Sequence, residues 1–129
     1  MQITQAKKDF ARGTVASIVE QSEHRVAPPC EHVGRGCGGC SWQHLDVAQH
    51  MEAKVAIVRE ALRRNGKIET LEVTAGGFVP PTASRTTLRM AVTPDGRLGF
   101  RRGGSHDVID TPTCLVAHPL LNDFIGDVR

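Results

Sequence analysis

The chain has no long hydrophobic run and no strong excess of charge. None of its apolar stretches approaches the ~20 residues that a membrane-spanning helix requires, and no apolar segment follows the lysines near its start. The sequence therefore predicts no membrane partner, no signal peptide and no transit peptide. A formal net charge of +2 at pH 7 is far from the strongly basic composition of many nucleic-acid-binding domains. We expect a folded, soluble, cytoplasmic protein.

Cysteine carries the clearest chemical signal among these 129 residues. Three cysteines, Cys30, Cys37 and Cys40, lie in one glycine-rich loop, and Cys114 follows far downstream. Cytosolic reductants keep thiols reduced, so metal binding or thiol reactivity is expected here rather than two disulfides. The glycines beside Cys37 and Cys40 allow the tight turn that a metal site needs. The tertiary fold must bring Cys114 to this loop.

The cysteine spacing alone leaves three interpretations open. A [4Fe–4S] cluster fits three closely spaced ligands and one distant ligand. Structural zinc usually takes two separated C-x2-C pairs, whereas Cys114 has only His118 nearby as a second ligand. A redox site would use Cys37 and Cys40 at a helix N-terminus, where the thiolate is favoured, and would leave Cys30 and Cys114 unexplained.

The most regular pattern predicts an amphipathic helix over residues 46–65. Its start is marked by Asp46, whose carboxylate is expected to cap the amide of Gln49, and its end by the Asn-Gly pair at 65 and 66. The apolar face, which we expect to pack in the core, comprises Ala48, Met51, Val55, Val58 and Leu62.

A period of two predicts strands on both sides of this helix. We expect one or two strands in residues 1–25, a strand at 71–76, a hairpin over 85–102 that turns at "PDG" (94–96), and a strand at 106–110. Pro119 opens a second helical pattern. The fold class is therefore α+β, with a small antiparallel sheet, a long amphipathic helix and a cysteine loop.

Several separate motifs together resemble one protein family. They are, in order, "PPCEHVGRGCGGCSWQHLD", "SRTTLRMAV", "GRLGFRRGGSHDVID" and "CLVAHPLLN". This series is similar to the iron–sulfur segment of the bacterial 23S rRNA (uracil-5-)-methyltransferases, which has a P-C, a short spacer, C-G-G-C, a Q-H-L and a fourth cysteine before P-x-x-N. The spacer after Cys30 is six residues long, where the family often has five. That difference bears on loop geometry more than on ligand identity.

The resemblance implies a ligand set and a domain organisation. Cys30, Cys37, Cys40 and Cys114 would bind a [4Fe–4S] cluster. Residues 1–25 would be the C-terminal part of an OB-like TRAM β-barrel, and residues 26–129 the iron–sulfur central domain that helps to bind RNA. The family's C-terminal Rossmann-like domain, which binds S-adenosylmethionine and carries the catalytic residues, would be absent.

The function that follows is that of a fragment of an S-adenosylmethionine-dependent enzyme that makes 5-methyluridine in 23S rRNA. We expect the chain alone to be inactive, because it would carry no catalytic residue. We expect it to bind RNA, with 23S rRNA as the partner, and to need no obligate protein partner. The cluster would be structural, because methyl transfer to uracil needs no electron. Two alternatives remain: a stand-alone zinc-stabilised RNA-binding module, and a thiol redox protein that uses Cys37 and Cys40.

The hairpin carries a local excess of positive charge. Its candidate RNA contacts are Arg85, Arg89, Arg101 and Arg102. The alternative is an ordinary solvated face. Trp42, directly after the cysteine loop, is expected to pack in the core, and His44 and His118 are expected to be structural because four thiols are already available.

Overall fold

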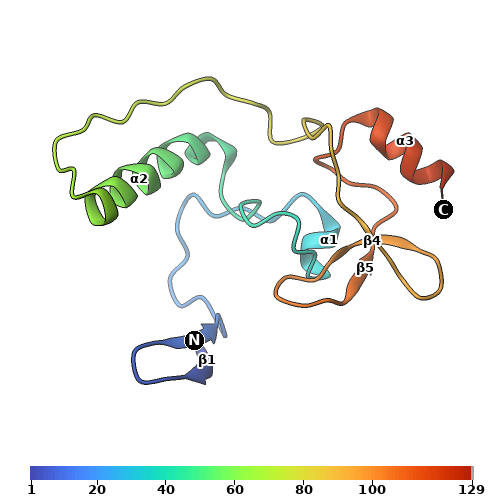
Figure 1. Ribbon diagram of the computed structural model, residues 1–129, viewed down its shortest axis with the longest axis horizontal. Helices are drawn as coiled ribbons and strands as arrows, with labels where there is room; N and C mark the ends of the chain where they lie inside the picture. The colour runs from blue at the N-terminus through green and yellow to red at the C-terminus, as the bar shows by residue number, and fades with distance from the viewer. Residues whose placement is uncertain (129) are drawn as a thin grey trace.

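The computed structural model describes residues 1–128 and has an α+β architecture. The described elements, in chain order, are β1 (Gln2–Ala6), β2 (Ala11–Thr14), α1 (Glu31–Gly34), α2 (Val47–Gly66), β3 (Ala91–Val92), β4 (Leu98–Arg101), β5 (Val108–Asp110) and α3 (Pro119–Asp127) (Figure 1). The strands form two separate antiparallel sheets, β1-β2 and β3-β4-β5. Within residues 1–128, no helix is both long and apolar enough to cross a membrane.

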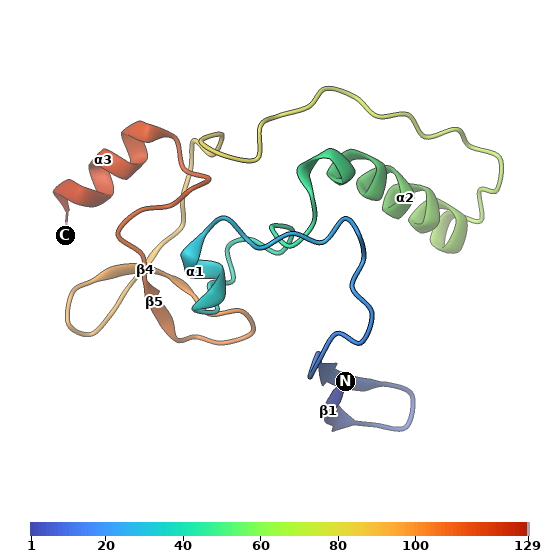
Figure 2. The same cartoon turned by 180° about the vertical axis from the view of Figure 1, so that it is seen from behind.

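The N-terminal sheet is a single hairpin that stands apart from the rest of the chain (Figures 1 and 2). Its two strands pair from Gln2 opposite Thr14 to Ala6 opposite Ala11, with an irregularity in the register between Ile3 and Gln5. Every residue of both strands is exposed. The hairpin agrees with the prediction of strands in residues 1–25, although the apolar residues after Thr14 lie outside them.

Helix α2 begins where the sequence predicts but ends one residue later. The Asp46 carboxylate caps the helix by accepting a hydrogen bond from the Ala48 amide, with a donor–acceptor distance of 3.0 Å. The prediction that the carboxylate caps the Gln49 amide was wrong, because the Gln49 amide donates to the Asp46 backbone carbonyl instead. Gly66 remains helical, and Lys67 takes the left-handed conformation with φ of 55°. The predicted stop at the Asn-Gly pair was therefore displaced by one residue.

The apolar face of α2 is only partly covered. Met51, Val55 and Leu62 are half-buried, whereas Ala48 and Val58 are exposed. The one buried residue of the helix is His50. After α2 the chain continues without regular structure, so the strand predicted at 71–76 was wrong. A strand needs a hydrogen-bonded partner, and the structure pairs no other segment with these residues.

The central sheet is built on the predicted hairpin. Strands β3 and β4 pair with Ala91 opposite Gly99, and β5 adds to the other side of β4 with Ile109 opposite Phe100. Gly96, with φ of 86°, makes the turn that the "PDG" sequence predicts. The strand is shorter than predicted, because residues 86–90 lie outside β3 and Arg85 forms only an isolated parallel bridge with Ala117.

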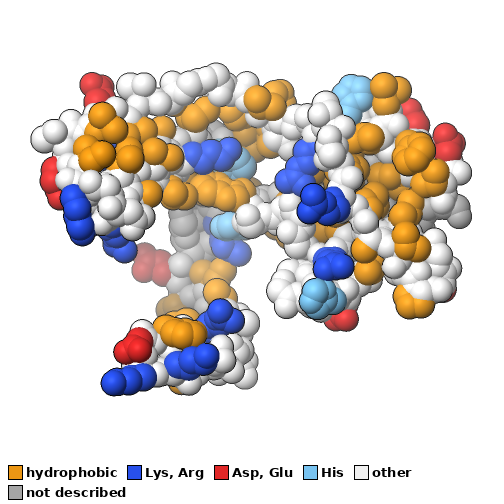
Figure 3. All heavy atoms as spheres, viewed as in Figure 1, with side chains coloured by type: hydrophobic (Ala, Val, Ile, Leu, Met, Phe, Trp, Pro, Cys, Tyr) orange, Lys and Arg blue, Asp and Glu red, His pale blue; other side chains and the backbone are white. Residues whose placement is uncertain are grey.

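The core is small and lies beside the cysteines. The buried hydrophobic residues are Ile109, Cys114, Val116, Ala117 and Ile125. The exposed surface is 9804 Å², whereas a compact monomer of this length exposes about 6,700 Å². Apolar side chains accordingly gather on the surface over α2 and over the part that carries α3 (Figure 3). The best-buried part of the fold is therefore the region around Cys114.

The pairing of β4 with β5 depends on a glycine. A side-chain Cβ at Gly99 would lie 2.0 Å from the Ile109 carbonyl oxygen, which belongs to the backbone and cannot rotate away. We expect Gly99→Ala to force the two strands apart and to lower the free energy of unfolding by about 3 kcal/mol. Chemical denaturation followed by circular dichroism measures this.

Gly34→Ala provides the matched control. A Cβ at Gly34 would meet no atom within 4 Å, so this variant should keep the stability of the unmodified chain. Equal stability of the Gly99 and Gly34 variants would contradict the close approach of β4 and β5.

Candidate metal centre

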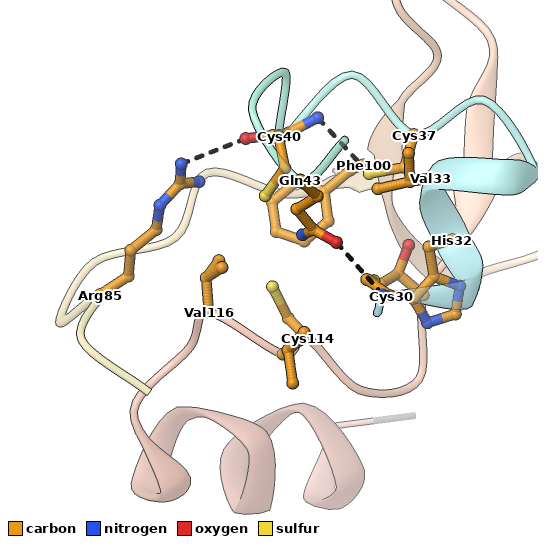
Figure 4. Close-up of a pocket in the computed structure, with 13 residues that line it drawn as sticks. Cys30, His32, Val33, Cys37, Cys40, Gln43, Arg85, Phe100, Cys114 and Val116 are labelled. Carbon is orange, nitrogen blue, oxygen red and sulfur yellow. Dashed lines mark hydrogen bonds between the residues drawn. The ribbon is translucent and has the colours of Figure 1, made fainter. Parts of the chain in front are cut away.

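The four cysteines line one cavity, although they come from distant parts of the chain. Cys30 is the N-cap of α1, Cys37 and Cys40 lie in the loop that follows α1, and Cys114 lies between β5 and α3. We call residues 30–40 the cysteine loop and the shared space the thiol cavity. Its volume is about 20 Å³, and it is partly open to solvent. The other lining residues include Val33, Phe100, Thr111, Leu115 and Val116 (Figure 4).

All four cysteines are free thiols. Cys114 is buried, with 8% of its surface exposed, and the three cysteines of the loop are half-buried. The sulfur atoms of Cys40 and Cys114 point into the space between the loop and the Cys114 segment (Figure 4). The predicted meeting of Cys114 with the loop is thus present, and it places four soft ligand atoms around one space.

Backbone hydrogen bonds attach the cysteine loop to the end of β4. The Gly38 amide donates to the Arg101 carbonyl at 2.9 Å, and the Gly103 amide donates to the Gly36 carbonyl at 3.1 Å. A Cβ at Gly38 would lie 3.0 Å from the Arg101 carbonyl oxygen and from Gly103. Glycine at position 38 therefore allows the loop to approach the hairpin closely.

Two side-chain amides hold the backbone at two of the cysteines. The Gln43 carbonyl oxygen accepts a hydrogen bond from the Cys30 amide at 3.1 Å. Asn122, on α3, binds the Cys114 backbone on both sides: its carbonyl oxygen accepts from the Cys114 amide at 2.8 Å, and its amide nitrogen donates to the Cys114 carbonyl at 3.1 Å. These contacts fix the Cys30 and Cys114 backbone positions, and Gln43 itself lines the cavity.

A third segment, residues 83–85, runs beside the residues that follow Cys114; we call it the strap. The Ala83 amide donates to the Leu115 carbonyl, and the Arg85 amide donates to the Val116 carbonyl at 2.8 Å. The Arg85 carbonyl accepts in turn from the His118 amide at 2.9 Å. The Arg85 side chain crosses to the cysteine loop, where its guanidinium donates to the Gly39 carbonyl at 3.1 Å (Figure 4).

The thiols influence one another electrostatically. Burial raises the pKa of the Cys37 thiol above its ordinary value, and the neighbouring Cys40, Cys30 and Cys114 raise it further. A hydrogen bond from the Gly39 amide to the Cys37 sulfur, at 3.5 Å, acts in the opposite direction. Several thiolates in this space would repel one another unless positive charge lies between them.

Among residues 1–128, no group of three or more His, Cys, Asp and Glu side chains is arranged to hold a metal ion. A single zinc ion requires all its ligands within about 2.3 Å of one point. In a four-iron cluster each cysteine binds a different iron, so the sulfur atoms lie farther apart. Four cysteine thiols are the donor set that a [4Fe–4S] cluster uses.

The other aromatic residues singled out from the sequence lie away from the thiol cavity. The Trp42 ring contacts His50 edge-on, with 5.6 Å between ring centroids, and the His50 Nε2–H donates to the Trp42 and Leu45 carbonyls. His118 caps α3 by accepting a hydrogen bond from the Leu120 amide. The prediction of His118 as structural agrees with this position. His44 is exposed and does not line the cavity.

Three residues of the site were not predicted. His32 is buried and lines the thiol cavity, and Gln43 and Asn122 supply the amide contacts. Gln43 belongs to the Q-H-L motif and Asn122 to the P-x-x-N motif, so the motifs marked both positions without giving their role.

The arginines of the hairpin fall into different surroundings. Arg89 and Arg101 line one surface hollow together with Gly38 and Gly39. Arg102 lines another, with Arg35 and Arg97. Arg85 lines the thiol cavity itself. Positive charge thus surrounds the cysteine loop on several sides.

Comparison with known proteins identifies relatives of this chain. The chain is 36% identical to the RNA methyltransferase TTE1812 of Caldanaerobacter subterraneus subsp. tengcongensis, over all of this chain and 29% of that protein. It is 36% identical to the 23S rRNA (uracil(1939)-C(5))-methyltransferase RlmD of Chromohalobacter salexigens, over 95% of this chain and 26% of that protein. The RlmD of Pectobacterium atrosepticum is 29% identical, over 100% of this chain and 29% of its own length.

The chain is homologous to RNA methyltransferases. The family resemblance drawn from the motifs is thereby confirmed. The chain spans less than a third of the length of these relatives. No model of a protein family matches it.

The Asn122 contact with Cys114 can be tested by mutation. Asn122→Ala would leave the Cys114 amide and carbonyl without these partners in a largely buried position. We expect the free energy of unfolding to fall by about 2 kcal/mol, measured by chemical denaturation of the reduced chain. Asp123→Ala, at the exposed next position of α3, is the control and should change stability little. A similar small effect for both variants would contradict the positioning role of Asn122.

Proposed function

We propose that this chain is the cluster-binding segment of an RNA methyltransferase that makes 5-methyluridine in 23S rRNA with S-adenosylmethionine as methyl donor. Cys30, Cys37, Cys40 and Cys114 would bind a [4Fe–4S] cluster. Residues 1–25 would belong to a TRAM-like β-barrel and residues 26–129 to the iron–sulfur domain. The catalytic residues and the binding site for the methyl donor would belong to a part of the enzyme other than residues 1–129. The enzyme would work in the cytoplasm, where thiols stay reduced.

The observation that carries this proposal is the convergence of four thiols on one cavity. Three come from a glycine-rich loop, and the fourth comes from a segment that only the tertiary fold brings near. An iron–sulfur cluster is bound by such a set of four cysteine thiolates. The names of the relatives support an RNA substrate, and two of the three relatives named above are 23S rRNA (uracil-C5)-methyltransferases.

The residues of this chain would hold the cluster and orient the arginines that contact RNA. The bound cluster would supply a rigid link between the cysteine loop and the Cys114 segment, because methyl transfer to uracil consumes no electron. The loop is also hydrogen-bonded to the β4 end, so it would fix the orientation of Arg89 and Arg101 relative to the core. Arginines held in this way can contact RNA phosphates in a defined register.

Metal analysis tests the cluster. We expect the chain purified without oxygen to be coloured and to contain about four iron and four sulfide per chain. Cys114→Ser should lose most of both, because it removes the one distant ligand. Thr113→Ser, at the exposed neighbouring position, should retain them.

Two other results would point elsewhere. One zinc per chain and no colour would move the proposal to the zinc-stabilised RNA-binding module. A chain without metal, whose Cys37 and Cys40 react as a dithiol after Cys30 and Cys114 are replaced, would support the redox alternative.

Salt dependence tests the RNA contacts. Replacing Arg89 and Arg101 together by Gln should weaken binding to a single-stranded RNA oligonucleotide and reduce the slope of log K against log salt by about 2. Replacing Arg59 and Arg64 together, both exposed on α2, makes the same charge change away from the loop and is the control. Equal effects of the two double variants would indicate that the hairpin arginines form only a solvated face.

A further inference from the structure

The thiol cavity has one charged side chain among its lining residues that is not a cysteine or a histidine. This is Arg85, on the strap, whose side chain is also exposed to solvent. The sequence alone placed it with the RNA-contacting arginines. In the structure its guanidinium donates to the Gly39 carbonyl, inside the C-x-x-C turn, at 3.1 Å.

Arg85 contacts both halves of the cysteine set. Its backbone pairs with Val116 and His118, close behind Cys114. Its side chain reaches the turn between Cys37 and Cys40 (Figure 4). The same residue therefore joins the segment with the distant ligand to the loop with the local ligands, independently of any bound group.

The charge of Arg85 matches what the cavity requires. Four thiolates carry more negative charge than an iron–sulfur core carries positive charge, so a cluster bound here is an anion. A guanidinium is always protonated and directs several N–H donors into one plane. Near a cluster, positive charge and hydrogen bonds favour the form with the extra electron, because that form is the more negative.

We infer that Arg85 is the positioning cation of the thiol cavity, which holds the C-x-x-C turn against the Cys114 segment and raises the reduction potential of the bound cluster. This inference rests on the proposed cluster. It removes Arg85 from the RNA-contacting set and leaves Arg89, Arg101 and Arg102 in it. One-electron reduction by an electrode adds charge to the cluster and neither forms nor breaks a bond to Arg85.

The test compares three variants of the full chain, each loaded with cluster without oxygen. Arg85→Gln keeps a planar hydrogen-bond donor but removes the charge, and Arg85→Lys keeps the charge. Arg59→Gln removes an equal charge from the exposed face of α2. The measurements are iron content and the midpoint potential from voltammetry. We expect a more negative potential for Arg85→Gln, and potentials close to that of the unmodified chain for Arg85→Lys and Arg59→Gln.

Each of the other outcomes either supports or overturns the role inferred for Arg85. Full iron content and an unchanged potential in Arg85→Gln would overturn the inference while leaving the cluster proposal intact. Loss of the cluster in Arg85→Gln with retention in Arg85→Lys would support it, because the charge would then be needed for binding. Loss of the cluster in both Arg85→Gln and Arg85→Lys would overturn the inference that the charge of Arg85 is what the site needs. An unmodified chain without iron would overturn the cluster proposal itself, and the inference with it.

Discussion

The contact between the cysteine loop and the Cys114 segment is the constraint on which the folded part of this chain depends. The core consists of few side chains, and they cluster around Cys114, Val116 and Ala117, with Cys40 and Phe100 packed against them. Two of the proposed ligands, Cys114 and Cys40, are thus also part of this packed cluster. A small core supplies little net stability, so the four thiols lie where an added cross-link would stabilise the fold most.

The proposed site would couple metal binding to folding. A preformed site rarely exists in an unfolded chain, and the free energy of metal binding then becomes free energy of folding. Here three ligands are close in sequence, while the fourth is fixed by Asn122, by the strap and by the bridge between Arg85 and Ala117. The loop can present three thiols alone, but the complete donor set requires the tertiary structure. Closing the long segment between Cys40 and Cys114 costs chain entropy that a cluster would offset.

Local elements of this fold were predictable from the sequence, and long-range ones were not. The Asp46 cap, the period of α2 and the "PDG" turn depend on residues a few positions apart, and the structure contains all three. The strand predicted at 71–76 failed because its alternating pattern has no partner to pair with. The role of Arg85 was inaccessible for a related reason: the position of its guanidinium depends on the strap, the Cys114 segment and the loop meeting in space, and no local pattern encodes that meeting.

The placement of positive charge would allow one arginine-rich stretch to serve both proposed purposes. Arg85 precedes β3, lines the thiol cavity and donates to the Gly39 carbonyl, whereas Arg89 and Arg101 line a hollow that Gly38 and Gly39 also border. The C-x-x-C turn thus borders both the cavity that Arg85 lines and the hollow that Arg89 and Arg101 line, and all three side chains are exposed. Phosphate contacts need exposed charge, and a cluster needs charge at short range, where salt screens it less. A glycine-rich turn serves this arrangement, because a Cβ at Gly38 would lie 3.0 Å from the Arg101 carbonyl oxygen and would push the turn away from the hairpin.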